Sequence, residues 1–169
     1  MKLFKKLAAA MLVAALALTM VGCGGRSSFV DQVKDVISDL CAIEDKELTN
    51  ANELDALAAK LVAEADKAAA KPENKDKPVL ELLTDNAVVT AAGIDAAKET
   101  YRVSAVENYK LLSSTVNKEK AILLAEALVD GTSKKIGNGS QDANSYGLAM
   151  GKINGKEYVV MLMNGQSTF

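Results

Sequence analysis

Two amphipathic patterns follow the first 28 residues of the chain. Over residues 29–43, apolar residues recur every three or four positions, and charged residues fill the opposite side. The same spacing returns from Leu54 and ends near Ala70, and Asn50 or Asn52 stands where a capping side chain is needed. We therefore expect two helices joined by a short polar connection.

Shorter helices are expected in the middle of the chain. Residues 71–78 hold both prolines and several charges, which predicts an exposed loop. Beyond it, residues 79–83 form a short apolar helical pattern, and residues 86–92 form another that Thr84 or Asp85 can cap. The second of these patterns stops at a glycine, as helices often do.

The period of the pattern then changes. Tyr101, Val103 and Ala105 alternate with polar residues, which predicts a strand. A helical period returns over residues 117–129. Residues 134–145 are rich in glycine, asparagine and serine, so we expect a loop there.

A hairpin gives the strongest local signal in the sequence. Residues 146–153 and 156–163 flank Asn154 and Gly155, the residue pair preferred in two-residue type I′ turns. A turn of this length fixes the register of the two strands. The expected cross-strand pairs are Lys152 with Glu157, Gly151 with Tyr158 and Ala149 with Val160.

The second strand of this hairpin predicts the layers of the fold. From Tyr158 to Met163 it is apolar on both faces, so it must be covered on both sides. The expected fold class is α+β, an α/β/α layered domain with a small antiparallel sheet and a C-terminal hairpin. A length of 169 residues, 49% of them hydrophobic, suits a single globular domain over residues 29–169.

The first residues carry a targeting signal. Three lysines precede an uncharged apolar run over residues 7–21, which is short for a membrane span and suits a signal peptide. The run ends in Met20-Val21-Gly22-Cys23, which resembles the lipobox of bacterial lipoprotein signal peptides. An ordinary cleaved signal and an uncleaved N-terminal anchor are the alternatives.

The lipobox resemblance implies a lipid modification and a cellular location. The Cys23 thiol would receive a diacylglyceryl group, residues 1–22 would be cleaved off as the signal peptide, and the new amino terminus would be acylated. Two or three acyl chains hold a membrane stably, whereas one does not. Residues 23–28 would then tether the domain to the extracytoplasmic face of the cell membrane, with the membrane as a partner through the N-terminal lipid.

Composition excludes several chemistries. The chain has no histidine, which removes Ser-His-Asp triads, Cys-His dyads and histidine-ligated metal sites. Without residues 1–22, 17 basic and 22 acidic residues remain, a formal charge of −5, so nucleic acid is not an expected partner. With Cys23 lipidated, Cys41 has no cysteine to pair with, and its apolar helical surroundings favour a small buried hydrophobe.

Several segments occur in the order of one known family. They are the helix Leu54-x-x-Leu-Ala-x-x-Leu-Val-x-Glu-Ala, the strand leading into Glu107-Asn108, the stretch Lys135-Ile136-Gly137 or Tyr146-Gly147-Leu148-Ala149, and the closing strand Tyr158-Val159-Val160. Together they resemble the CAP superfamily, the domain of cysteine-rich secretory proteins, antigen 5 and pathogenesis-related proteins. Val106 replaces the glycine of the family's Gly-Glu-Asn segment.

The CAP resemblance implies a central cleft in which two histidines and two acidic residues can hold a metal ion. Glu107 matches one of the acids, and both histidine positions are empty because the chain has no histidine. We therefore expect no metal, no cofactor and no catalytic residue, and we regard Glu107 and Asn108 as a candidate cleft. The alternative for these two residues is a polar strand end that hydrogen-bonds to the next turn.

Three functions fit these features. We favour a non-catalytic, membrane-anchored lipoprotein that acts as a binding or interaction module toward an unidentified envelope ligand or protein. Its contacts would come from the loops over residues 71–78 and 134–145, since binding residues favour loops on a rigid scaffold. The second function is an envelope hydrolase that uses Glu107 with another acid, and the third is a structural envelope protein without a ligand.

Overall fold

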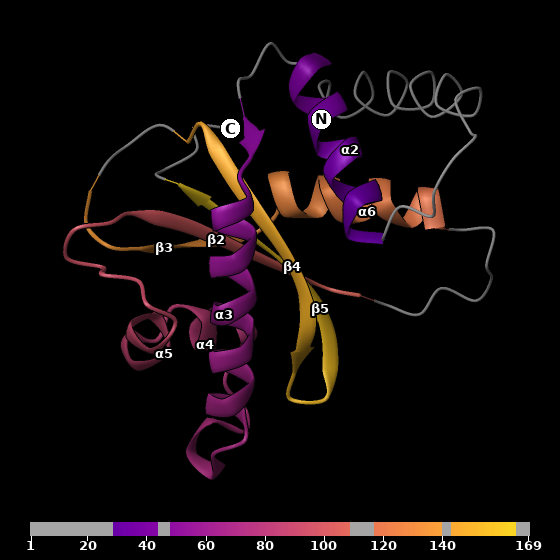
Figure 1. The fold of residues 1–169 in the computed structure, drawn as a ribbon. Coiled ribbons are helices and arrows are strands. Elements are labelled where there is room, and N and C mark those ends of the chain that lie inside the picture. Colours follow the sequence, from indigo (N-terminus) through magenta and orange to yellow (C-terminus); the bar gives the residue numbers. More distant parts are fainter. Residues whose placement is uncertain (1–28, 44–47, 109–116, 140–142, 165–169) are drawn as a thin grey trace.

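A five-stranded sheet separates two layers of helices in this chain (Figure 1). The structure is a computed structural model that describes residues 29–43, 48–108, 117–139 and 143–164. The predicted signal peptide, the tether and Cys23 lie outside the described residues. The elements are α2 (Phe29–Ile43), β1 (Thr49–Asn50), α3 (Asn52–Ala69), η2 (Pro72–Asn74), α4 (Val79–Leu83), α5 (Asn86–Ala91), β2 (Tyr101–Glu107), α6 (Asn117–Asp130), β3 (Ser133–Ile136), β4 (Ser145–Ile153) and β5 (Lys156–Asn164).

The sheet runs in the order β1-β4-β5-β2-β3. The pairs β4–β5, β5–β2 and β2–β3 are antiparallel, whereas β1 is parallel to β4 and pairs Asn50 with Tyr146. The α+β class is therefore confirmed. The prediction of an antiparallel sheet is wrong at one edge, because β1 makes the sheet mixed.

The two edge strands lack the pattern that identifies a strand. β1 has only two residues, and both are exposed. β3 places two exposed lysines before its single buried residue, Ile136. Neither strand has the alternation of a half-buried strand. The loop predicted over residues 134–145 is thus wrong at its start, where Lys134 and Lys135 pair with β2.

The β4–β5 hairpin has the predicted register. Asn154 and Gly155 have φ angles of 53° and 76°, the left-handed values that a type I′ turn needs. The N–H of Asn154 also donates to the Asp66 carboxylate at 3.0 Å, which ties the turn to the last part of α3. The confirmed pairs are Lys152 with Glu157, Gly151 with Tyr158 and Ala149 with Val160.

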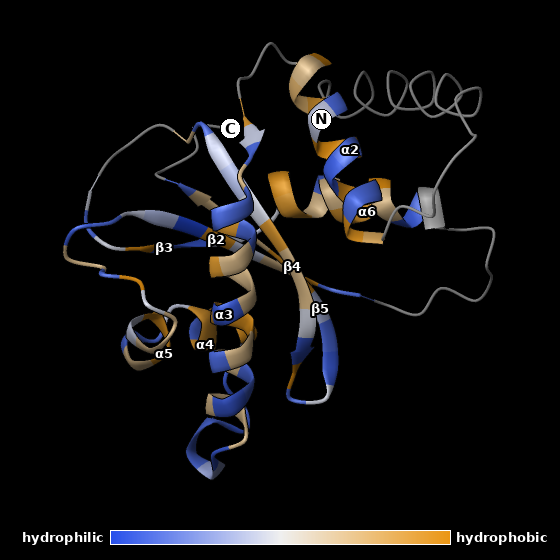
Figure 2. Ribbon diagram, in the orientation of Figure 1, coloured by the Kyte–Doolittle hydropathy of each residue, from blue (hydrophilic) through white to orange (hydrophobic). Residues whose placement is uncertain are grey.

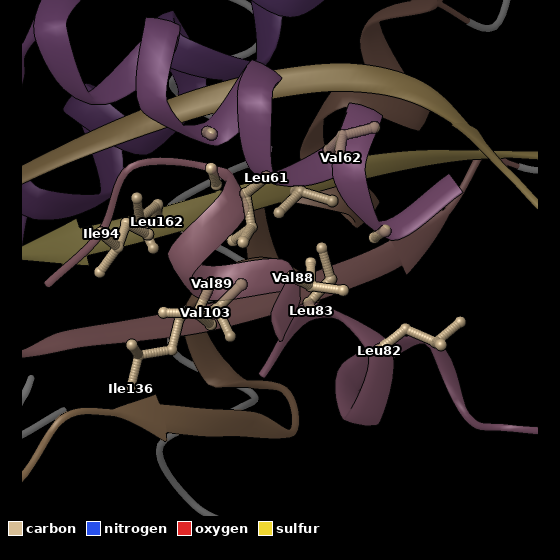
Figure 3. Close-up of a cluster of buried hydrophobic side chains, with 14 of the residues drawn as sticks. Leu61, Val62, Leu82, Leu83, Val88, Val89, Ile94, Val103, Ile136 and Leu162 are labelled. Atoms are coloured by element: carbon tan, nitrogen blue, oxygen red, sulfur yellow. The ribbon is translucent and has the colours of Figure 1, made fainter. Parts of the chain in front are cut away.

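Strand β5 contributes to both hydrophobic cores, as its two-sided apolar pattern predicts. Val160 and Leu162 belong to the core under α3, α4 and α5, which Figure 3 shows. Val159, Met161 and Met163 belong to the core under α2 and α6, and all five side chains are fully buried. Figure 2 shows hydrophilic residues at the tip of the hairpin and hydrophobic ones where β5 passes between the helices.

Helix α3 starts without a side-chain cap. Its N-cap is Ala51, so the predicted cap by Asn50 or Asn52 is wrong. The Asn50 amide instead donates to Asp55 Oδ1 at 2.9 Å and to the carbonyl of Tyr146 at 3.1 Å. Asn50 therefore ties the start of α3 to β4.

The middle helices lie where the pattern places them. Asp85 caps α5 by accepting the N–H of Ala87 at 3.0 Å, whereas the Thr84 hydroxyl donates backward to the carbonyl of Leu80. Residues 71–78 are mostly exposed, as predicted, and contain η2. No helix in the described ranges is both long enough and apolar enough to cross a membrane.

Helix α3 lies directly against the backbone of β4 because two glycines of the strand carry no side chain. A Cβ atom at Gly147 would lie 2.1 Å from the carbonyl carbon of Leu54, a backbone atom. At Gly151 it would lie 2.7 Å from a methyl group of Val62, which belongs to a side chain rather than to the backbone. The close approach of the α3 and β4 backbones therefore requires a glycine at position 147.

We expect Gly147→Ala to lower the free energy of unfolding by about 3 kcal/mol, because α3 and β4 must separate to admit the methyl group. Gly151→Ala, in the same strand, is the matched control and is expected to cost about 1 kcal/mol or less, because the Val62 side chain can move. Urea unfolding of the full chain measures both changes. Equal losses for the two variants would contradict this account of the helix–strand contact.

Candidate functional site

Glu107 and Asn108 lie where β2 leaves the sheet. The Glu107 carboxylate pairs with Lys156 Nζ of β5 at 3.2 Å, and the Glu107 side chain is 26% exposed. The Asn108 amide donates to the Glu157 carboxylate at 2.6 Å, and its backbone N–H donates to the Glu157 carbonyl at 2.7 Å. These contacts hold the end of β2 against β5, and a cleft at this point stays a prediction.

A groove of about 730 Å³ lies between the C-terminal half of α2 and the segment where β1 passes into α3. Its walls come from three separate stretches of chain, which the sheet and α2 bring together (Figure 1). Small apolar residues alternate there with hydroxyl, amide and carboxylate groups. The lining residues are Cys41, Ala42, Leu48 and Ala51, together with Ser38, Thr49, Glu53, Asn144 and Ser145.

Asp55 fixes the relation of α2, α3 and β4 beside this groove. Its Oδ2 pairs with Lys34 Nζ at 2.5 Å, and its Oδ1 accepts hydrogen bonds from the Asn50 amide at 2.9 Å and from the Leu148 N–H at 2.8 Å. Because β1 ends at Asn50, the carboxylate takes the place of the strand residue that would otherwise accept the Leu148 N–H. One side chain thus connects both helix layers with the sheet.

Tyr146 adds a second link between α2 and β4. The residue is 2% exposed, and its hydroxyl donates to the carbonyl of Lys34 at 3.3 Å. Burial raises the pKa of the Tyr146 phenol, and the neighbouring Cys41, Asp55 and Asp35 raise it further. The phenol therefore stays protonated at neutral pH and can keep donating this hydrogen bond.

Cys41 is a buried cysteine, as the helical pattern predicts. It is 5% exposed and belongs to the core under α2 and α6, while its edge borders the groove. In the part of the chain that the structure describes, no group of three His, Cys, Asp or Glu side chains is placed to hold a metal ion. The residues that line the groove offer a ligand hydrogen-bonding groups, small apolar contacts and the negative charge of Glu53.

The two loops expected to present contacts border different hollows. Asn144 and Ser145, which end the second loop, line the groove. Lys71 and Asn74, from the first loop, line a hollow of about 150 Å³ between α3 and α5. A further hollow of about 430 Å³ lies at the end of α5, near Gly93. Glu107 and Asn108 line none of these three.

Comparison with known proteins gives no match, whether with family models, with curated proteins or with solved structures. The function of the groove must therefore be argued from its own residues.

The contacts of Asp55 leave little trace in the sequence. An acidic residue in the first turn of a helix is common because it complements the helix dipole. Nothing local to Asp55 indicates that its partner Leu148 lies 93 residues further along the chain. Only the fold reveals that this carboxylate completes the edge of a strand.

Replacing Asp55 by alanine is expected to lower the free energy of unfolding by about 2–3 kcal/mol, because a partly buried N–H and an ammonium group lose a charged acceptor. Hydrogen exchange at the Leu148 amide should accelerate. Glu53→Ala, an exposed acid in the same helical turn, is the control and should cost less than about 0.5 kcal/mol. Equal costs for the two variants would contradict the role given to Asp55.

Asp39 on α2 makes the stability of the fold depend on pH. Burial raises the pKa of this carboxyl, and repulsion by Asp35 raises it further. The folded state thus holds the proton of Asp39 more tightly than the unfolded state, so the protonated carboxyl stabilises the fold at low pH. This stabilisation is lost as the pH rises through the pKa of Asp39 in the folded state. Asp39→Asn should raise Tm at pH 7 and leave it nearly unchanged at pH 3. Asp76→Asn, an exposed acid in the 71–78 loop, should change Tm at neither pH, and a lower Tm for Asp39→Asn at pH 7 would refute the assignment.

Proposed function

We propose that this chain is a lipoprotein anchored on the extracytoplasmic face of the cell membrane, and that its domain is a non-catalytic binding module. The location is supported by the motif Met20-Val21-Gly22-Cys23 at the end of an uncharged run that follows three lysines. Without residues 1–22 the chain carries a formal charge of −5, so acyl chains rather than electrostatic attraction would hold it to anionic lipid.

The observation that carries the binding role is a groove along α2, the first described element after the proposed anchor. α2 begins at Phe29, six residues after Cys23, and the groove lies along the other end of α2, at Ser38, Cys41 and Ala42. At 1.5 Å per residue, about 18 Å of helix separates Phe29 from Cys41. The groove would therefore lie toward the end of α2 that is farther from the proposed anchor along the chain.

The chemistry of the groove supports binding rather than catalysis. Among the described residues of its lining there is one carboxylate, Glu53, whereas carboxylate catalysis uses a pair of acids with different pKa values. Glu107, the acid considered for an envelope hydrolase, pairs with Lys156 and lies outside the groove. We further propose that the domain is CAP-like without the histidine site, which the helix layers on both faces of its sheet support.

Metabolic labelling tests the anchor. In a bacterium that is fed an alkyne-tagged palmitate, the full chain should carry the label, and Cys23→Ala should lose it because no thiol remains at the acylation site. Cys41→Ala is the matched control and should stay labelled, since that thiol is buried. An intact mass that shows an unmodified Cys23, or a label that survives Cys23→Ala, would overturn the proposed address.

A further inference from the structure

The groove runs beside an open strand edge. Among the described strands, β1 is the first in the order of the sheet and pairs with β4 alone. Leu48, Thr49 and Ala51, which include and flank this strand, line the groove between β1 and α2. A ligand in the groove would therefore lie next to strand backbone.

The direction of the backbone groups follows from two hydrogen bonds. The Thr49 N–H donates to the carbonyl of Asn144 at 3.0 Å, and the Ala51 N–H donates to the carbonyl of Tyr146 at 2.8 Å. Backbone groups of successive strand residues point to opposite edges, so the N–H and C=O of Asn50 point away from β4. Asn50 is exposed, and this pair of groups matches the donor and acceptor that a neighbouring strand presents.

One acidic side chain lines the groove, and two more lie beside it on α2. Glu53 lines it, and Asp35 and Asp39 lie on the face of α2 that also carries the groove residues, because they are spaced from them by three or four positions. Lys34, on the same helix, is already paired with Asp55. The local charge therefore favours a ligand with positive charge.

The edge strand β3, at the other side of the sheet, carries lysines that β1 does not have. β3 exposes Lys134 and Lys135, and lysines on an edge strand oppose the addition of a further strand. Residues 48–51 carry no charged side chain. The groove residues named above include no aromatic ring, which disfavours a flat ligand that binds by stacking. An extended peptide is the ligand that uses both the outward backbone pair of Asn50 and the groove beside it.

We propose that the groove binds an extended, lysine-containing segment of a partner protein, which adds to the open edge of β1 as a further strand. This inference rests on the binding role proposed above and names the class of partner. The backbone of the segment would pair with Asn50, and its basic side chains would lie toward Glu53 and the acidic face of α2. Since β1 is short, the groove walls supply the contacts that two backbone hydrogen bonds alone do not.

The probe is a fluorescein-labelled peptide of six alternating lysines and valines. The protein is the full acylated chain in a non-ionic detergent, and fluorescence anisotropy measures binding at 150 mM salt. We expect saturable binding that weakens at least tenfold when glutamates replace the lysines. Two further peptides carry N-methyl groups on alternate residues, in one register or the other. Methylation of the edge that faces β1 should weaken binding at least tenfold, whereas the opposite register should stay within threefold of the unmodified peptide.

Variants of the protein place the peptide in the groove. Ser38→Trp fills the groove from an exposed position and should weaken binding at least tenfold, whereas Ala63→Trp, an exposed position on α3 outside the groove, should leave it unchanged. Glu53→Lys should weaken binding to a similar extent, and Glu73→Lys on the exposed η2 is its control.

Three results would overturn the inference. The first is equal affinity for both methylated registers, and the second is binding that Ser38→Trp leaves intact. Failure of a folded, correctly acylated chain to bind any of the peptides would also overturn this partner class while leaving the proposed anchor in place. An unacylated Cys23 in the intact mass of the same preparation would instead count against the proposed function itself.

Discussion

The structure depends on the contact between the first turn of α3 and the backbone of β4. Gly147 brings the two backbones together because a methyl group there would overlap the carbonyl carbon of Leu54. One residue further along each element, the Asp55 carboxylate accepts the N–H of Leu148. A helix thereby covers an edge that a two-residue strand leaves open, and the backbone group stays satisfied without a longer β1.

This contact also sets the spacing of the two helix layers. Asp55 belongs to α3, which covers one core, yet it pairs with Lys34 of α2, which covers the other. The Tyr146 hydroxyl reaches the backbone of the same residue of α2. The position of α2 relative to β1, and hence the width of the groove, is therefore fixed by polar contacts at one point of an otherwise apolar helix face.

Elements with a strong local pattern were predictable from the sequence, and elements defined by distant contacts were not. The Asn154-Gly155 turn carries its own backbone preference, and the apolar run of β5 requires cover on both sides, so the hairpin and the layers followed directly. β1 and β3 are edge strands with almost no buried side chains, and no local pattern marks them. The groove was missed for a similar reason, since only the fold brings the end of α2, the start of α3 and the residues before β4 together. Glu107 and Asn108, the two residues singled out as a candidate cleft, contact the side chains of Lys156 and Glu157 on β5.

Strand β5 has a consequence for the order in which the protein assembles. It follows every other described strand in the chain, yet it occupies the middle of the sheet and supplies side chains to both cores. During synthesis, neither layer can close until its nine residues have emerged from the ribosome. Both cores therefore become complete only when the last described strand has been made, so the chain reaches its full stability late in its synthesis.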